Sequence, residues 1–289
     1  MKKSQKTKDA PAERAALSRI LVALDDSRQS KAALEAAASM AERLQAELEG
    51  MFIEDTDLLQ MAALPFAHEI GFTSRSRRLL DSNIMARALR ARASMVRKTF
   101  EDIASKHRLV SSFRVTRGQV LAELLAATEQ VDLIAVGTTG HKVGRGGRPG
   151  ATYTGVVESC QCSVLLLQEH VTTGRSVIVL FDGSDDAAQT LKQARSLARA
   201  QSDPLVIALL SGSDDPANLR QQAFNLVGDQ EDVSFVELTE TQLDDLPSVL
   251  SHYQCGVFLV PRATSRQEPR LNVERLAQLH CPVLLLSPR

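Results

Sequence analysis

Residues 20–27 read Ile-Leu-Val-Ala-Leu-Asp-Asp-Ser, and residues 177–184 repeat the pattern as Val-Ile-Val-Leu-Phe-Asp-Gly-Ser. Each stretch is a short apolar run that ends in Asp-X-Ser and precedes a segment with apolar residues at helical spacing. Such a run is typical of a buried strand, and the serine stands where a helix N-cap is expected. The chain therefore contains the start of a strand–turn–helix unit twice.

The two copies also end alike. Residues 162–167 read Cys-Ser-Val-Leu-Leu-Leu, residues 281–286 read Cys-Pro-Val-Leu-Leu-Leu, and apolar runs at 131–136 and 255–260 precede them. This self-similarity predicts two homologous units, the second one shorter. Within each unit apolar runs alternate with helical patterns, which favours a parallel sheet covered by helices.

We therefore expect an α/β fold made of two tandem, open, parallel five-stranded sheets with helices on both faces. The expected strands lie near 20–24, 48–53, 111–116, 131–136 and 163–167, then near 177–181, 205–210, 233–238, 256–260 and 283–286. Domain 1 would span 19–170 and domain 2 would span 175–289, after a flexible tail at 1–18. The linker is short, so the two domains should lie against each other as an intramolecular pseudo-dimer.

Composition limits the classes of function. The formal net charge is −1 and aromatic residues make up 4% of the 289 residues, which argues against nucleic acid as a partner. The chain has no long apolar run and no apolar segment after its Lys-rich start, so neither membrane insertion nor secretion is expected. Four scattered cysteines fit a reducing compartment, and a cytoplasmic location is expected.

A glycine-rich loop follows the fourth expected strand of domain 1. It runs from Gly137 through Gly140 to Gly150, with Lys and Arg residues between them. Glycines let backbone N–H groups approach an anion, and a helix N-terminus adds partial positive charge. Ligands of open parallel sheets bind beyond the carboxyl ends of the strands, where Asp25 also falls. Spacing alone leaves open a surface loop whose glycines serve turns.

Here the sequence resembles the universal stress protein superfamily, over residues 19–168 and more faintly over 176–288. Nucleotide-binding members of that family carry Gly-X2-Gly-X9-Gly followed by Ser or Thr, and Gly137, Gly140 and Gly150 have this spacing. The resemblance implies that domain 1 binds an adenine nucleotide: ATP, or else AMP or ADP. The glycine amides would then hold the phosphates.

The resemblance also implies roles for neighbouring residues. Asp25 would face the ribose or adenine. Asp25 and Asp26 are adjacent carboxylates of the kind that can bind Mg²⁺, but alternation along a strand would turn only Asp25 toward the pocket. Ala151 departs from the family's hydroxyl residue, Thr152 stands one position late, and Pro149 lacks an N–H. The candidate cofactor-binding residues are Asp25, Gly137, Gly140, Gly150, Ala151 and Thr152.

Domain 2 keeps Asp182 after its first strand but lacks the loop. Pro261 replaces the first glycine, and no glycine follows it in the chain. The same phosphate cradle cannot form there, so domain 2 is expected to be a structural partner of domain 1.

The leading hypothesis is a nucleotide-binding protein that acts in stress response or signalling through contacts with other proteins. The sequence shows neither a catalytic constellation nor a metal-ligand grouping, so we expect no enzyme activity beyond slow ATP hydrolysis. The alternative is a protein-interaction scaffold without a nucleotide site in either domain. Whether two chains form a homodimer stays open.

Overall fold

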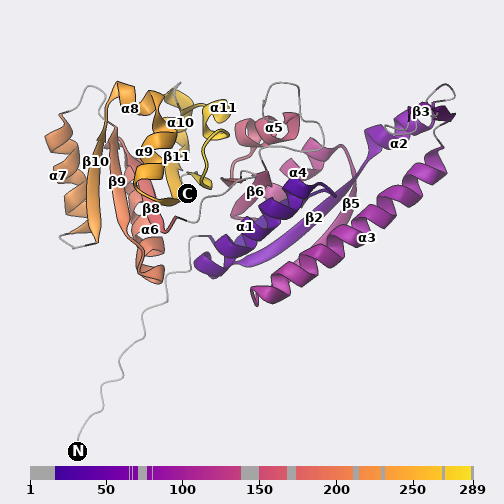
Figure 1. Cartoon of the computed structure of the whole chain (residues 1–289), viewed down its shortest axis with the longest axis horizontal. Coiled ribbons are helices and arrows are strands. Elements are labelled where there is room, and N and C mark those ends of the chain that lie inside the picture. Colours follow the sequence, from indigo (N-terminus) through magenta and orange to yellow (C-terminus); the bar gives the residue numbers. More distant parts are fainter. Residues whose placement is uncertain are drawn as a thin grey trace, which may run out of the picture.

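The chain builds one long sheet from two similar halves. The computed structural model describes residues 17–64, 66, 68–70, 77–79, 81–137, 150–167, 174–210, 215–228, 232–268 and 271–287. Their main element is a ten-stranded sheet in the order β10-β9-β8-β11-β12-β7-β6-β1-β2-β5. The two halves lie side by side in Figure 1, the first in indigo to rose and the second in salmon to yellow.

Each half supplies five parallel strands in the same relative order, with the reversal of strand order beside its first strand. The first half contains β1 (Arg19–Leu24), β2 (Glu47–Asp55), β5 (Ser111–Gly118), β6 (Leu133–Gly137) and β7 (Ser163–Leu167). The second half contains β8 (Ser176–Phe181), β9 (Leu205–Leu210), β10 (Val233–Leu238), β11 (Cys255–Pro261) and β12 (Val283–Leu286). The α/β class and all ten expected strands are confirmed.

The two halves join through their last strands. β7 and β12 pair antiparallel, with Val164 opposite Leu285 and Leu166 opposite Val283. The expectation of two separate sheets is therefore corrected to one sheet with an antiparallel seam. Every residue of β7 and β12 is buried. Such apolar strands would be exposed and open to non-specific pairing if they remained at a sheet edge, and the seam covers both.

Helices cover both faces of this sheet, and the alternation of side chains along the strands separates two apolar cores. One face carries α1 (Arg28–Leu44), α3 (Ser82–Lys106), α6 (Asp185–Gln201) and α7 (Pro216–Val227). The other carries α4 (Val120–Thr128), α5 (Ala151–Ser159), α8 (Glu240–Asp244), α9 (Leu246–His252) and α11 (Val273–Leu276). Among the described residues, no helix combines the length and apolar character needed to cross a membrane.

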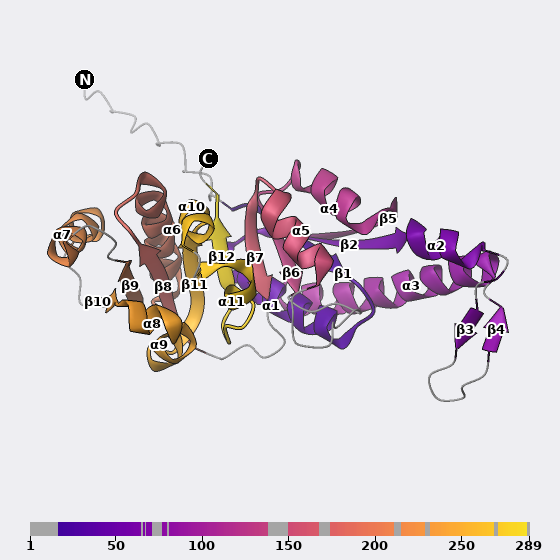
Figure 2. The same ribbon diagram turned by 90° about the horizontal axis from the view of Figure 1, so that it is seen from above.

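Three further elements complete the described structure. α2 (Thr56–Ala62) follows β2, and α10 (Arg262–Gln267) follows β11 directly. A short antiparallel hairpin pairs β3 (His68–Ile70) with β4 (Arg77–Leu79). In Figure 2 this hairpin lies at the end of the molecule farthest from the second half.

The predicted helix caps are confirmed in both halves. The side chain of Ser27 accepts a hydrogen bond from the backbone N–H of Ser30 at 3.0 Å, and α1 begins at the next residue. The side chain of Ser184 accepts one from the N–H of Ala187 at 3.1 Å, and α6 begins likewise. Each serine thus satisfies one backbone N–H that the first turn of a helix leaves unpaired.

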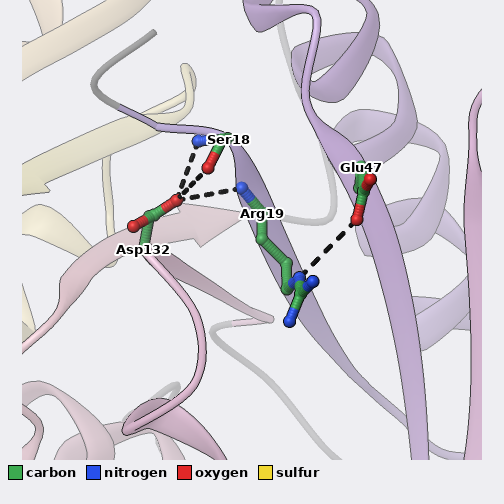
Figure 3. A network of polar contacts seen from close by, with 4 residues as sticks. All are labelled: Ser18, Arg19, Glu47 and Asp132. Carbon is green, nitrogen blue, oxygen red and sulfur yellow. Dashed lines mark hydrogen bonds and ion pairs between the residues drawn. The ribbon is translucent and has the colours of Figure 1, made fainter. Parts of the chain in front are cut away.

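Residues 17 and 18, which the sequence places at the end of the tail, make contacts with the first half. Leu17 is buried, and both the N–H and the hydroxyl of Ser18 donate to Asp132 Oδ2, at 2.9 and 2.7 Å. Figure 3 shows this cluster, in which the N–H of Arg19 also donates to Asp132 and its side chain pairs with Glu47. The rest of the expected tail and most of the expected linker lie outside the described residues.

Candidate functional site

The described residues enclose a cleft of about 350 Å³ beyond the carboxyl end of the first half's sheet. Its lining comes from β1 and the turn after it, the end of β2, α2, α3 and α4, and both sides of the glycine loop. The cleft lies between β1 and β6, where the strand order of this half reverses. Diverging connections leave a crevice at that point in open α/β sheets.

Five of the sequence-predicted site residues come together in this lining: Asp25, Gly137, Gly150, Ala151 and Thr152. They derive from three separate elements, the turn after β1, the end of β6 and the first turn of α5. Gly140, the sixth, lies outside the described residues, together with the rest of the loop at 138–149.

The turn after β1 is held by hydrogen bonds of its own. Asp25 Oδ1 accepts the N–H of Ser27 at 3.0 Å, and the N–H of Asp25 donates to Ser30 Oγ at 2.9 Å. Asp26 also lines the cleft, and its Oδ2 lies 3.3 Å from Arg92 Nε. The expectation that only Asp25 faces the pocket is therefore corrected, because β1 ends at Leu24 and strand alternation stops there.

The Gly150 side of the cleft presents bare backbone. Gly150 is the N-cap of α5, with φ −66° and ψ 153°, and no side chain caps the helix there. These angles suit any residue, and a Cβ built on Gly150 meets no atom of the described residues within 4 Å. The fold therefore does not require glycine at this position. Without a side chain, the N–H groups of the first turn of α5 stay open to an anion.

An apolar wall makes up much of the remaining lining, with Met51, Leu58, Leu89, Val120 and Leu124. These residues come from β2, α2, α3 and α4. Sequence reasoning missed them because their periodicity marks them as core, and nothing local shows which core residues border a cleft. A cleft with an apolar wall and a few polar groups is the usual form of a small-molecule site.

The charged groups of the described lining were only partly expected. Arg92 is its one cationic side chain, against the carboxylates of Asp25, Asp26 and Asp55. Asp55 Oδ1 caps α2 by accepting the N–H of Asp57 at 2.9 Å. The described lining is thus acidic overall. The Lys and Arg residues of the glycine loop are not among the described residues.

Tyr153 was also missed and is the most unusual group in the lining. Its side chain is buried, and its hydroxyl has no hydrogen-bond partner within the described part of the chain. Burial raises the pKa of Tyr153 above its usual value, so the hydroxyl stays protonated and remains a donor. An unpaired buried hydroxyl costs free energy, which makes its presence beside a cleft informative.

The corresponding turn of the second half is closed. Asp182 follows β8 as Asp25 follows β1, but its Oδ2 accepts a hydrogen bond from the hydroxyl of Thr264 in α10 at 2.5 Å. The segment after β11 is this short helix, beginning with Arg262, in place of a glycine loop. Within the described ranges no group of three or more His, Cys, Asp or Glu residues could hold a metal ion.

Comparisons with known proteins agree with this architecture. A model of the universal stress protein family matches residues 17–168. A universal stress protein from Archaeoglobus fulgidus DSM 4304 matches at 16% identity, over 93% of this chain and 96% of that chain, with a TM-score of 0.66. A protein from Pseudomonas aeruginosa UCBPP-PA14 assigned to the same family matches at 14% identity over 95% and 94%, with a TM-score of 0.59.

At such identities the structural matches establish the fold alone. A universal stress protein in complex with cAMP matches at 17% identity over 39% of this chain and 96% of that chain, and its TM-score of 0.34 is too low for a comparison of sites. Comparison with curated proteins gave no match. The family model spans more than half of the chain, and the sheet has two similar halves. The chain therefore belongs to the universal stress protein family, in its tandem form.

Proposed function

We propose that this protein binds an adenine nucleotide in the cleft of its first half, and that the bound state governs contacts with other proteins in stress response or signalling. ATP is the proposed ligand, with ADP and AMP as the nearest alternatives and Mg²⁺ as an accompanying ion. The proposed location is the cytoplasm, in keeping with four free cysteines. Residues 19–170 and 175–289 are proposed as the two domains.

One observation carries this proposal. Gly150 lines the cleft, although neither its backbone angles nor its described neighbours require a glycine at this position. A phosphate group needs close approach to N–H groups, and a side chain at this position would obstruct it. The apolar wall suits an adenine ring, and the carboxylate of Asp25 can accept hydrogen bonds from ribose hydroxyls.

A ligand-free scaffold remains the competing function, and one observation favours it. The described lining holds three carboxylates against Arg92 alone, which opposes a polyanion. Nucleotide binding therefore requires that the basic residues of the glycine loop and the amides of α5 outweigh these carboxylates. The proposal can therefore be tested by varying the charge of the ligand. The carboxylates of the lining should repel AMP less than they repel ATP.

The test is nucleotide content after purification, followed by calorimetric titration with ATP, ADP and AMP, with and without Mg²⁺. GTP serves as the control ligand. Asp25→Asn keeps an oxygen that can accept the Ser27 N–H but replaces the second oxygen with an amide, which cannot accept from a ribose hydroxyl, and we expect it to weaken AMP binding about tenfold. The matched control is Asp182→Asn in the second half, which should leave affinity unchanged. Absence of co-purified nucleotide, of binding heat and of thermal stabilisation by ATP would favour the scaffold.

A further inference from the structure

A buried arginine of the second half reaches into the first half. Arg262, the first residue of α10, is 4% exposed. Its Nη2 donates to the carbonyl of Val157 at 2.5 Å, and its Nη1 donates to the carbonyl of Cys162 at 2.8 Å. Nη1 also lies 3.5 Å from Cys160 Sγ. Burying a guanidinium is costly, so this arrangement requires acceptors at defined positions, and the first half provides most of them.

Val157 lies in the last turn of α5, Cys160 is its C-cap, and Cys162 lies between α5 and β7. The last carbonyls of a helix lack partners within the helix and carry partial negative charge. α5 has no basic residue in its own last turn. The second half supplies the missing positive charge, because Arg266 Nη2 also donates to the carbonyl of Glu158 at 3.1 Å. Two arginines of α10 thus cap a helix of the other half.

The opposite end of α5 borders the cleft. Gly150, Ala151, Thr152 and Tyr153 all lie in its lining, and the whole helix is only nine residues long. A Cβ on Gly155 would approach the side chain of Leu121 in α4 to 2.6 Å, so the two helices pack closely at this point. We therefore expect a shift at the C-terminal end of this short helix to displace the amides at its N-terminal end.

The two halves differ in the segment that carries Arg262. β6 and β11 are the corresponding strands of the two halves. In the first half the glycine loop follows β6, whereas in the second half Pro261 ends β11 and Arg262 opens α10. The segment that would form a second phosphate loop instead contacts the first half.

We propose that the second half acts as a brace for α5, and that Arg262 is the positioning residue that holds the Gly150 side of the cleft in its binding geometry. This inference rests on the proposed nucleotide site and gives the second half a role in it. One consequence of the brace can be measured without ligand. α5 should open less often when Arg262 is present than when it is absent.

The experiment compares two arginines that link the halves. Arg262→Met removes the brace and keeps an apolar chain of similar length. Arg43→Met is the matched control: Arg43 in α1 pairs with Asp203 of the second half at 2.7 Å, on the other helical layer and away from α5. We measure hydrogen exchange of peptide 151–159 without ligand, and ATP affinity by calorimetry, in the full chain.

Arg262→Met should speed exchange in α5 and weaken ATP binding by about tenfold. Arg43→Met should lower the melting temperature yet leave both readings at the wild-type level. Wild-type exchange and affinity in Arg262→Met would overturn the brace, as would equal losses in both variants. If the wild type binds no ATP, the proposed function fails, and hydrogen exchange of peptide 151–159 alone tests whether Arg262 braces α5. If Arg262→Met does not fold, Arg266→Met replaces it, with a smaller change expected in both readings.

Discussion

Thr264 donates a hydrogen bond from its hydroxyl to Asp182 Oδ2, at 2.5 Å, across the end of β8. The turn that carries Asp182 is built like its counterpart in the first half. Asp182 Oδ1 accepts the N–H of Ser184 at 3.0 Å, and Asp25 Oδ1 accepts the N–H of Ser27 at 3.0 Å. The two halves therefore differ in what lies above the turn. α10 closes over Asp182, whereas Asp25 borders a cleft.

This closure predicts a pH-dependent contribution to stability. Burial raises the pKa of Asp182, but hydrogen bonds from Ser184 and Thr264 outweigh burial and hold the pKa below its usual value of 3.8. The folded state thus favours the charged form. The resulting stabilisation is complete above the usual pKa and is lost as pH falls through the lowered one.

Urea unfolding from neutral pH down to below pH 3.8 measures this contribution. The free energy of unfolding of the wild type should fall as the pH is lowered over this range. In Asp182→Asn the free energy of unfolding should fall by less. Thr264→Val should show an intermediate fall, since Ser184 still stabilises the carboxylate. Identical acid profiles for all three proteins would show that the Asp182 contacts add nothing in solution.

Gly150 should be replaceable without damage to the fold. Alanine suits its backbone angles and meets no atom of the described residues, so Gly150→Ala should cost only about 0.5–1 kcal/mol, the difference between the two residues at an N-cap. If a phosphate binds the α5 amides as proposed, a methyl group at position 150 should crowd it, so ATP affinity should fall about tenfold, and Gly150→Val should lower it further. Calorimetry and thermal melts on the same samples separate the two effects. Wild-type affinity in the valine variant would remove Gly150 from the site.

Tyr153→Phe should change stability and binding in opposite directions. The tyrosine hydroxyl is buried and has no partner among the described residues, and such a group costs about 1–3 kcal/mol, so its removal should leave the ligand-free protein equally or more stable. If the hydroxyl donates to bound nucleotide, the same change should weaken ATP binding several-fold. Tyr253→Phe, at the chain's other tyrosine, is the control. A loss of ligand-free stability in Tyr153→Phe would mean that the hydroxyl already has a partner.

Cys160 should titrate well below an ordinary thiol. A hydrogen bond from Cys162, opposed by burial and aided by the charge of Arg262, lowers the pKa of Cys160 below that of an ordinary thiol. The thiolate form should therefore stabilise the fold at alkaline pH, with this contribution lost as pH falls through the lowered pKa. Ultraviolet thiolate absorbance against pH measures the midpoint directly.

Two variants assign that signal. Cys160→Ser should abolish the low-pH transition, and Arg262→Met should move it to higher pH. Cys255→Ser is the control, because burial raises the pKa of Cys255 well above its usual value and keeps that thiol out of the neutral range. A first thiolate transition in the range of a free cysteine would contradict the Cys160 assignment.

The sequence alone determined the strands, the helix caps and the difference between the halves. β7, β9, β10 and β12 have the expected bounds, since an apolar run between turn residues is a local signal. Ser27 and Ser184 cap their helices because an N-cap needs only its own next three residues. Pro261 excluded a second glycine loop for the equally local reason that it has no N–H.

Only the tertiary structure decided which distant groups meet. No periodic pattern in the sequence predicts four features of the structure. They are the antiparallel seam between β7 and β12, the ion pair of Asp26 with Arg92, the buried Tyr153 hydroxyl without a partner among the described residues, and the hydrogen bond from Arg262 to Val157. Local patterns record which face of an element is apolar, and many neighbours satisfy that requirement equally well. Packing selects among them, and the cleft and its brace depend on that selection.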